Sequence, residues 1–289
     1  ISRGLVGSEM CIRDRLYGDL TISCIDENEF IIFGSGAAQE MHRRWFESHI
    51  NKFNLYYKNR SDDFHGLSIS GPKSREVLQK VVRDDLSNDK FKFRDSRRIF
   101  VAGVPAIVNR ISFTGELGFE IYVAPHYQIK LYEELSEAGK EFNIKPFGLR
   151  ALMSMRLEKN WGAWTLDYRP DFTAKETGLD AFINWDKDFI GKKFAMNDKS
   201  NNKLTPMIVE TNEIDVTFNE AVLKRDKAIG YVTSGGFAHY VNKSIAFSYI
   251  DENELNSGSD IQVEINGDLF NCNLIKEPLY DPSGSKMRS

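Results

Sequence analysis

The sequence predicts an α+β fold followed by a small β-barrel, and two observations carry this prediction. Before about residue 200, strand-like and helix-like runs follow one another without the strict strand–helix–strand order of a parallel sheet. After that point only short β-type runs remain, separated by turns, at residues 207–211, 229–236, 244–250 and 261–275. In the last run, Asn266–Gly267 lies between alternating apolar residues, which is a strong signal for a two-residue hairpin turn.

The first domain is expected over residues 16–200, and the periodicity of its apolar residues predicts its elements. Residues 17–36 indicate two short strands joined by an acidic turn, and residues 37–53 follow with helical spacing. Later elements are expected as a strand and a helix in 66–82, two or three strands in 97–124, and helices in 126–142 and 146–161. The helix in 126–142 is amphipathic, with Ile129, Tyr132, Leu135 and Ala138 along one face.

The domain boundaries follow from changes in composition. A polar stretch rich in Lys and Asn, residues 195–205, indicates a connection to the barrel domain, which is expected over residues 201–282 with a tail at 283–289. Residues 1–15 have interspersed charges and lack the apolar core of a signal peptide. We interpret residues 1–15 as a non-native segment joined to a truncated gene, and we exclude them from the prediction of the fold.

The overall composition excludes several classes of protein. A net charge of −4 and the lack of a long Lys/Arg run argue against a nucleic-acid partner. No apolar run approaches the roughly 18 residues of a membrane span, so no membrane association is expected. Three scattered cysteines and five histidines without ligand spacing predict neither a disulfide framework nor a metal site. This cysteine usage indicates a reducing cytoplasm.

Two acidic residues in the stretch 110–123 are candidates for ligand binding. Glu116 falls in a Thr-Gly-Glu-Leu-Gly turn and is expected in water. Glu120 lies between Phe119 and Ile121 in a predicted strand, with the opposite parity to both. A buried carboxylate needs hydrogen-bond donors. A ligand edge with two adjacent N–H groups and a structural arginine satisfy it equally well, so spacing alone leaves both partners open.

Asp19 lies near the start of a half-buried strand, where Leu20 and Ile22 have the opposite parity to Thr21 and Ser23. A carboxylate in such a place can act as a base or stabilise a cationic intermediate over a pocket. An exposed acid at the end of a strand has the same pattern, and spacing does not separate the two.

Aromatic residues are concentrated in the stretch 158–182. Aromatic faces stack on flat ligands, and Arg169 between them could meet an anionic group. Core packing is the alternative use of the same residues, which are Trp161, Trp164, Tyr168 and Phe172. If they bind a ligand, the composition indicates a flat heteroaromatic compound with an anionic tail.

A series of motifs resembles, in order, the folate-binding half of dimethylglycine and sarcosine dehydrogenases and, more distantly, the glycine cleavage T-protein, an aminomethyltransferase. The resemblance extends from Leu16 to about Pro282. Its main motifs are YGDLTIS, EFIIFGSG, ISGPKSREVLQKV, DDLSNDKFKF, RISFTGELGFEIY, MRLEKNWGAW, ETGLDAFINWDKDFIGKKF and KEPLYDP. The stretches DDLSNDKFKF and RLEKNWGAW look closer to the dehydrogenases than to the T-protein.

The resemblance implies a tetrahydrofolate site and assigns roles to individual residues. Glu120 occupies the position of the glutamate that clasps the 2-amino and ring N–H groups of the pterin. Phe113 stands where the family has a tyrosine beside the pterin, so the ring is retained without its hydroxyl. Asp19 matches the catalytic aspartate, and Arg156 belongs to the retained RLE motif. The expected cofactor-binding set is Glu120, Phe113, Tyr17, Arg156, Trp161, Trp164 and Arg169, with Asp19 catalytic.

From this resemblance we expect a one-carbon-transfer module of a dimethylglycine/sarcosine dehydrogenase-like enzyme. The module would trap an amine-derived one-carbon unit as methylene-tetrahydrofolate, with folate and a methylamine-derived donor as partners. FAD would belong only to an N-terminal part of the parent, and the T-protein-like domain is expected to be incomplete at its N-terminus. The alternatives are a standalone aminomethyltransferase or folate-dependent demethylase, and a non-catalytic folate-binding regulatory protein.

Overall fold

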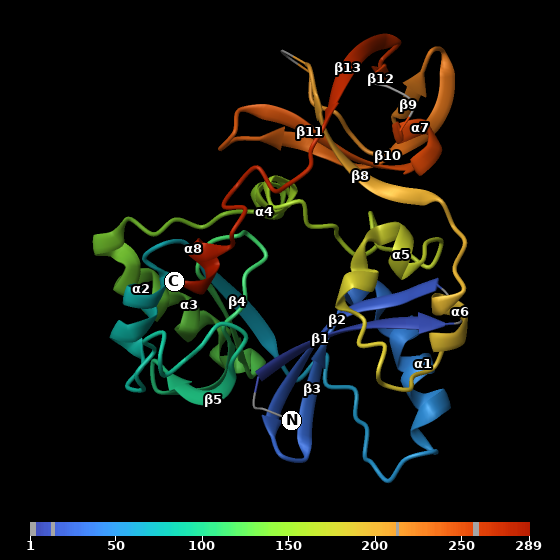
Figure 1. Ribbon diagram of the computed structural model, residues 1–289. Helices are drawn as coiled ribbons and strands as arrows, with labels where there is room; N and C mark the ends of the chain where they lie inside the picture. Colours follow the sequence, from blue (N-terminus) through green and yellow to red (C-terminus); the bar gives the residue numbers. More distant parts are fainter. Residues whose placement is uncertain (1–3, 13–14, 212–213, 257–259) are drawn as a thin grey trace. The chain divides into compact units, whose positions relative to one another are not determined.

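The computed structural model describes residues 4–12, 15–211, 214–256 and 260–289, and the chain divides into two compact units. Of the described residues, the first unit comprises 4–8, 20–152 and 283–289. The second comprises residues 9–19 and 153–282. The predicted combination of mixed sheets and helices with a C-terminal barrel is confirmed (Figure 1).

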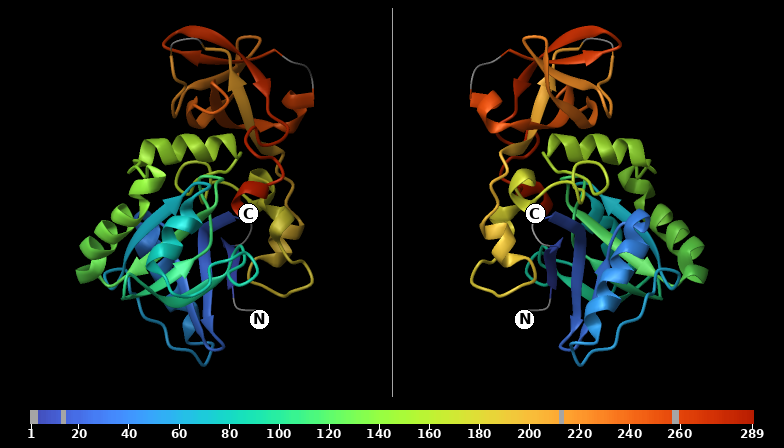
Figure 2. Two further views of the ribbon diagram at one scale, coloured as in Figure 1. Left: turned by 90° about the vertical axis from the view of Figure 1, so that its left-hand side faces the viewer. Right: turned by 90° about the vertical axis from the view of Figure 1, so that its right-hand side faces the viewer.

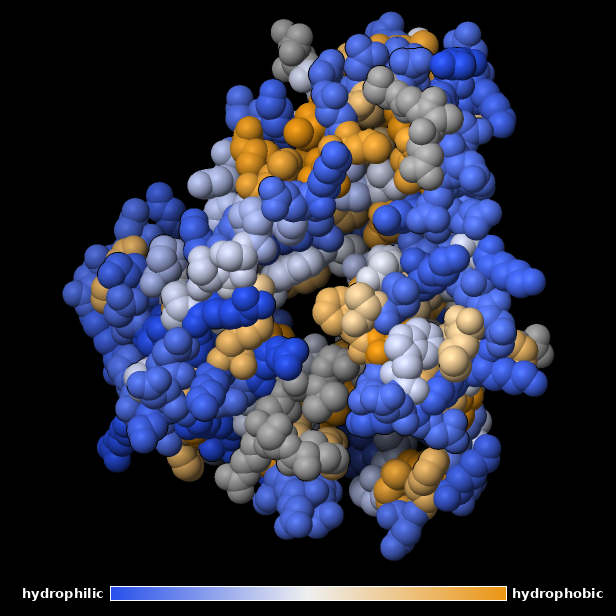
Figure 3. Space-filling model, in the orientation of Figure 1, coloured by the Kyte–Doolittle hydropathy of each residue, from blue (hydrophilic) through white to orange (hydrophobic). Residues whose placement is uncertain are grey.

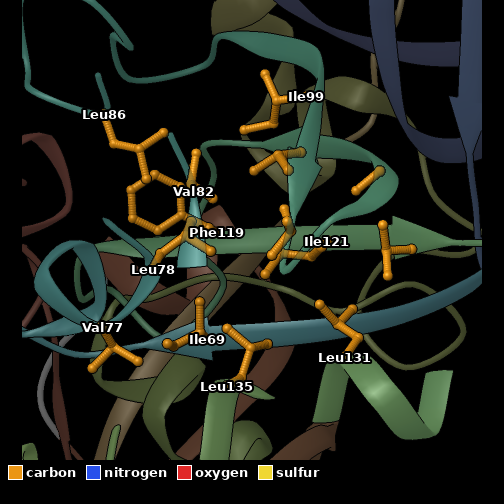
Figure 4. Packing of buried hydrophobic residues seen from close by; sticks show 14 of the residues in the cluster. Ile69, Val77, Leu78, Val82, Leu86, Ile99, Phe119, Ile121, Leu131 and Leu135 are labelled. Carbon is orange, nitrogen blue, oxygen red and sulfur yellow. The ribbon is translucent and has the colours of Figure 1, made fainter. Parts of the chain in front are cut away.

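The first unit contains an antiparallel four-stranded sheet in the order β4-β7-β6-β5. Its strands are β4 (His65–Ser70), β5 (Ser96–Val101), β6 (Val104–Asn109) and β7 (Gly118–Val123). Helices α2 (Ser74–Val81) and α3 (Gln128–Gly139) bury their apolar side chains against one face of it. Figure 4 shows this core, in which Phe119 and Ile121 of β7 meet Leu78 of α2 and Leu135 of α3.

The alternation of side chains along β7 determines what the other face of the sheet carries. Phe119, Ile121 and Val123 are almost completely buried in the core, so Glu120 and Tyr122 point to the opposite face. Glu120 pairs in register with Ser68 on β4 and with Asn109 on β6. The second face of the sheet is therefore polar around Glu120.

Helix α3 agrees with the predicted helix, but its apolar face differs from the predicted one. Leu131 and Leu135 are buried and Ala138 packs against the same core. Ile129 and Tyr132, expected on that face, are 73% and 52% exposed. The buried face is formed by Leu131, Leu135 and Ala138, which pack against the strands of the sheet and against α2.

A second sheet, in the order β1-β2-β3, is formed by β1 (Gly4–Ile12), β2 (Arg15–Asp26) and β3 (Glu29–Phe33). The predicted hairpin is therefore present, and helix α1 (Gln39–Ile50) follows it. Strand β1 lies in the segment that we excluded from the prediction; of that segment, residues 1–3 and 13–14 lie outside the described residues.

The second unit contains a closed barrel in the strand order β10-β11-β8-β13-β12-β9. Figures 1 and 2 show its strands, which are β8 (Asn202–Val209), β9 (Ala221–Lys224), β10 (Lys227–Ala238), β11 (Lys243–Asp251), β12 (Ile261–Ile265) and β13 (Asp268–Leu274). Asn266 and Gly267 have φ angles of 54° and 93°, which is the geometry of the predicted type I′ turn between β12 and β13. The short helix α7 (Glu252–Asn256) follows β11.

Short helices connect the remaining parts. Helix α4 (Leu149–Glu158) corresponds to the expected helix in 146–161, and α5 (Ala174–Thr177) and α6 (Lys192–Met196) precede the barrel. Thr173 and Glu176 form a capping box at the start of α5.

Figure 3 shows apolar side chains on the surface of the barrel. No helix in the described part of the chain combines the length and the apolar character needed to cross a bilayer.

The segment 283–289 forms α8 (Ser285–Arg288) and belongs to the first unit. The completely buried guanidinium of Arg110 donates to the carbonyl oxygens of Arg288 and Ser289, at 3.0 and 2.7 Å. Arg75 donates to the same Ser289 oxygen at 2.7 Å. Burial lowers the pKa of Arg110 to about 10. Arg75 and Arg110 thus hold the segment 283–289 against the rest of the first unit.

Candidate functional site

Glu120 is a partly buried carboxylate with one strong protein partner. The Tyr122 hydroxyl donates to its Oε2 atom over 2.6 Å. Desolvation raises the pKa of Glu120, and the hydrogen bond from Tyr122 opposes that rise only in part. Within the described residues, no arginine or lysine pairs with it. The structural arginine that spacing left open is therefore not its partner.

Three elements hold the ring of Tyr122. The Phe33 ring of β3 stacks on it with centroids 4.2 Å apart and planes inclined by 27°. On β4, a Cβ atom at Gly66 would lie 2.9 Å from the tyrosine Cε1 atom, so only glycine leaves room for the ring. The hydroxyl that bonds Glu120 is thus fixed by the packing of the ring against Phe33 and Gly66.

Asn109 lies opposite Glu120 on the neighbouring strand and is completely buried. Its Oδ1 atom accepts from the hydroxyls of Ser23, at 3.1 Å, and Ser96, at 2.6 Å. Ser96 belongs to β5, on the far side of Asn109 from β7. The amide nitrogen of Asn109 has no hydrogen-bond partner among the described residues.

The turn before β7 carries Phe113 and Glu116. Gly115 has a φ of +86°, and its backbone N–H donates to Ser112 Oγ at 3.0 Å. The N–H of Glu116 donates to Thr114 Oγ1 at 3.2 Å. The predicted turn is present, but Glu116 is only partly exposed, as is Phe113. These contacts fix the backbone that leads into Glu120.

Asp19 lies on β2 within the second unit. Its side chain keeps accessible surface, yet desolvation by the surrounding protein raises its pKa. Leu16 and Leu20, on the other face of the strand, are buried, and Tyr17 is half-buried. Asp19 is thus an accessible carboxylate whose charged form is disfavoured by its surroundings, a property common among catalytic acids and bases.

Arg156 lies in a buried network, away from solvent. Its Nη1 atom is 2.6 Å from Asp167 Oδ2 and also donates to the Trp161 carbonyl oxygen. Asp167 further accepts from the hydroxyls of Thr233 and Ser234, at 2.6 and 2.8 Å. The ion pair therefore joins α4 to strand β10 of the barrel. The resemblance placed Arg156 in the cofactor-binding set, but its guanidinium is engaged within the protein.

The other charges of the same motif also hold segments of the second unit. Glu158 accepts from the backbone N–H of Tyr240 at 2.7 Å. Lys159 Nζ donates to the Asp281 carbonyl oxygen at 2.6 Å and lies 3.7 Å from its carboxylate. All of these charged side chains are buried. The Arg-Leu-Glu-Lys motif is thus a set of structural anchors.

The predicted aromatic platform is distributed along the second unit. The backbones of Trp164 and Tyr168 form an isolated β-bridge. The Trp164 side chain packs against a small core that contains Leu16. The Trp161 ring lies under Lys159 Nζ, 5.6 Å from its centroid.

Arg169, expected beside these rings, is paired within the protein. It donates to the Tyr231 hydroxyl, and its Nε atom is 3.2 Å from Asp171 Oδ2. Its guanidinium also lies over the Phe172 ring, 5.2 Å from the centroid. These contacts agree with the core-packing alternative, and they give Arg169 partners that a ligand would have to replace.

The predicted site residues thus fall in both units. Glu120 and Phe113 lie in the first unit, and the second contains Asp19, Tyr17, Arg156, Trp161, Trp164 and Arg169. Prediction from the sequence missed Tyr122 and Asn109. The shared parity of Glu120 and Tyr122 on one strand was a usable signal for the first. Pairing with Asn109 depends on strand register, for which the sequence has no local signal. The described residues contain no group of three or more His, Cys, Asp or Glu side chains suited to a metal ion.

Comparisons with known proteins match the barrel and the part of the chain before it to separate domains. Residues 10–187 match the GCVT N-terminal domain, and residues 203–281 match the glycine cleavage T-protein C-terminal barrel domain. Human dimethylglycine dehydrogenase is 34% identical over 96% of this chain, and this chain spans 33% of that protein's length. The mouse protein is 35% identical over the same share.

Shorter relatives match over most of their own length. An aminomethyltransferase of Thermoanaerobacter pseudethanolicus is 31% identical over 93% of this chain and 73% of its own. The crystal structure of the glycine cleavage system aminomethyltransferase T from Bartonella henselae has the same fold, with a TM-score of 0.83 over 96% of this chain and 76% of its own, at 19% identity. The chain belongs to the glycine cleavage T-protein family.

Proposed function

We propose that this chain is a tetrahydrofolate-binding one-carbon-transfer module of a dimethylglycine/sarcosine dehydrogenase-like enzyme. It traps an amine-derived one-carbon unit as methylene-tetrahydrofolate. The observation that carries the proposal is the Glu120 carboxylate, which is partly buried, has a raised pKa, and has no cationic partner among the described residues. Similarity to the dimethylglycine dehydrogenases over 96% of this chain supports the dehydrogenase-like assignment.

The surroundings of Glu120 fit the edge of a pterin ring. Such an edge presents two adjacent N–H donors, and one carboxylate can accept from both. Tyr122 occupies only part of the acceptor capacity of the carboxylate, since its hydroxyl bonds Oε2 alone. Asn109, the neighbour of Glu120 on β6, has an amide nitrogen without a hydrogen-bond partner among the described residues. Phe113, in the turn before β7, offers a ring to the flat ligand in this proposal.

The other proposed residues act on the transferred carbon or on the rest of the ligand. Bound tetrahydrofolate supplies the nitrogens N5 and N10 that carry the one-carbon unit. In its ionised form the Asp19 carboxylate stabilises positive charge on that unit, and the positive charge in turn offsets the desolvation that raises the Asp19 pKa. Tyr17, Trp161, Trp164 and Arg169 remain in the proposed ligand-binding set, and Arg156 does not, because its charge is paired with Asp167.

Amine oxidation, with FAD as cofactor, is assigned in this proposal to the two thirds of a dimethylglycine dehydrogenase-like parent that this chain does not match. The described thiols Cys24 and Cys272 are buried and free, which supports a reducing compartment. We therefore propose a cytoplasmic location, although the matched human and mouse dimethylglycine dehydrogenases are mitochondrial.

A standalone aminomethyltransferase or folate-dependent demethylase is the second candidate. The match to the Thermoanaerobacter aminomethyltransferase favours it, because 73% of that protein is covered compared with 33% of human dimethylglycine dehydrogenase. A third candidate is a non-catalytic folate-binding regulatory protein, in which Glu120 binds the ligand without subsequent transfer.

A titration followed by a transfer assay separates these candidates. Calorimetric titration of tetrahydrofolate into the 289-residue chain is expected to show one ligand per chain. Formation of methylene-tetrahydrofolate is then followed with formaldehyde, or with an aminomethyl donor, against the uncatalysed rate. Acceleration with formaldehyde supports the dehydrogenase-like module, and acceleration only with the aminomethyl donor supports the aminomethyltransferase. Binding without acceleration indicates the regulatory protein, and no binding overturns the folate proposal.

A further inference from the structure

We propose that Tyr122 is a positioning residue for ligand binding, which fixes the Glu120 carboxylate in the orientation that accepts two adjacent N–H donors. This inference rests on the proposed function. Tyr122 lies outside the residues that the family resemblance assigned, and its role follows from the hydrogen bond and ring packing described above.

The hydrogen bond fixes the orientation of the carboxylate. Glu120 and Tyr122 are two residues apart on β7 and therefore point to the same face of the sheet. The hydroxyl meets Oε2 at 2.6 Å, the distance of a charge-assisted O–H···O⁻ bond. A glutamate side chain otherwise rotates broadly about its last bond. With Oε2 held, Oε1 and the second lone pair of Oε2 keep fixed directions.

The packing of the tyrosine ring makes it a rigid support. Phe33 covers one side of the ring at a centroid distance of 4.2 Å. Gly66 has no side chain next to the ring. A Cβ atom at this position would lie only 2.9 Å from Tyr122 Cε1 and 3.0 Å from Cδ1. The ring is thus held by β3, β4 and β7 before any ligand arrives. A group held in this way loses little conformational entropy when the carboxylate binds.

The electrostatic surroundings of Tyr122 keep its hydroxyl protonated, so that it can donate a hydrogen bond to Glu120. Burial and the neighbouring Glu120 charge raise the pKa of Tyr122, so its hydroxyl remains protonated at neutral pH. Across the sheet, the neighbours of Glu120 are Ser68 on β4 and Asn109 on β6, both uncharged. Among the described residues, Tyr122 is the single titratable group that acts on the Glu120 charge.

The test compares Tyr122→Phe with Tyr132→Phe, a control on the exposed side of α3. Tyr122→Phe keeps the ring between Phe33 and Gly66 and removes only the hydroxyl. We expect it to weaken tetrahydrofolate binding by roughly tenfold, because the carboxylate is then no longer held in the orientation that accepts both donors. The acidic limb of the pH profile for binding is also expected to move to higher pH, since the bond that lowers the Glu120 pKa is lost. Tyr132→Phe is expected to change neither quantity.

A double-mutant cycle separates positioning from a general effect on folding. If Tyr122 acts through Glu120, Tyr122→Phe has no further effect on binding in the Glu120→Gln background. Gly66→Ala keeps the hydroxyl but displaces the ring, and it is expected to weaken binding in the same way even if Tyr122→Phe does not fold. Glu120-dependent binding with an unchanged affinity and pH profile in Tyr122→Phe overturns this inference alone. Failure of the wild-type chain to bind tetrahydrofolate overturns the proposed function itself.

Discussion

Arg156 and Asp167 form an ion pair that is completely buried, with 2.6 Å between Nη1 and Oδ2. The carboxylate also accepts from the backbone N–H of Ala163 and from two hydroxyls of β10. The Asp167 carboxylate therefore links helix α4, the loop that contains Ala163 and strand β10 of the barrel. From this relationship we expect the ion pair to be needed for the stability of the second unit.

Removal of Asp167 is expected to destabilise the second unit strongly. Asp167→Ala leaves the Arg156 guanidinium buried without a counter-charge, at a cost of about 3–5 kcal/mol in the free energy of unfolding. Asp260→Ala breaks the exposed Arg225–Asp260 pair, whose side chains are 75% and 62% accessible, and is expected to change little. Urea denaturation of both variants provides the measurement. Equal stability of Asp167→Ala and Asp260→Ala would refute the structural role of the network.

Glu120→Gln is expected to stabilise the chain without ligand. Desolvation raises the pKa of Glu120 above its ordinary value of 4.5, so the folded state holds this proton more tightly than the unfolded state. As pH rises from about 4.5 through the folded pKa, the wild type loses stability that the uncharged glutamine retains. Thermal unfolding should show the variant more stable by about 1 kcal/mol at neutral pH, with no difference at strongly acidic pH. A variant less stable at neutral pH would contradict this account of the site.

Asp19→Asn is expected to separate transfer from binding. The substitution removes the charge proposed to stabilise the cationic one-carbon unit and keeps the size of the side chain. The transfer rate should fall by about 10²–10³-fold, while tetrahydrofolate affinity stays within a factor of about three. Asp26→Asn, at the other end of the same strand, is the matched control. A loss of affinity equal to the loss of rate would assign Asp19 to ligand binding instead.

Phe113 is expected to contribute its ring to the ligand and to tolerate a hydroxyl. Phe113→Ala should weaken tetrahydrofolate binding by about tenfold, because ring contact with a flat ligand is worth roughly 1–3 kcal/mol. Phe113→Tyr restores the side chain that the family resemblance implies, and it should bind at least as tightly as the wild type. Fluorescence titration measures both affinities. Tight binding by Phe113→Ala would remove Phe113 from the site.

The fold was predictable where local patterns determine structure. Asn266–Gly267 specified a type I′ hairpin, and the alternation around Glu120 specified which face of β7 is buried, because turn geometry and strand parity are short-range properties. The apolar face of α3 was less well predicted. Leu131 is buried, whereas Ile129 is exposed, because the neighbouring strands and α2 determine which apolar residues face the core.

The partners of charged residues were not predictable, because they are distant in sequence. Arg156 meets Asp167 only through the loop that joins them, and Asp167 meets Thr233 only through the closed barrel. Likewise, Arg110 binds the carbonyl oxygen of Ser289, in a segment that the sequence indicated only as a tail. Neither periodicity nor spacing encodes such contacts. Glu120 differed, since its partner Tyr122 lies on the same strand and shares its parity.

The most direct test of the central claim is the tetrahydrofolate affinity of Glu120→Gln compared with Glu116→Gln, two substitutions of the same kind four residues apart. Glutamine at position 120 replaces a charged acceptor of two N–H groups by a neutral amide, and each such bond is worth about 1.5–3 kcal/mol. Calorimetry should show a loss of affinity of about thirtyfold or more for Glu120→Gln and of less than about twofold for Glu116→Gln. Wild-type affinity in Glu120→Gln, or an equal loss in both variants, would contradict the assignment of Glu120 as the residue that binds the pterin edge.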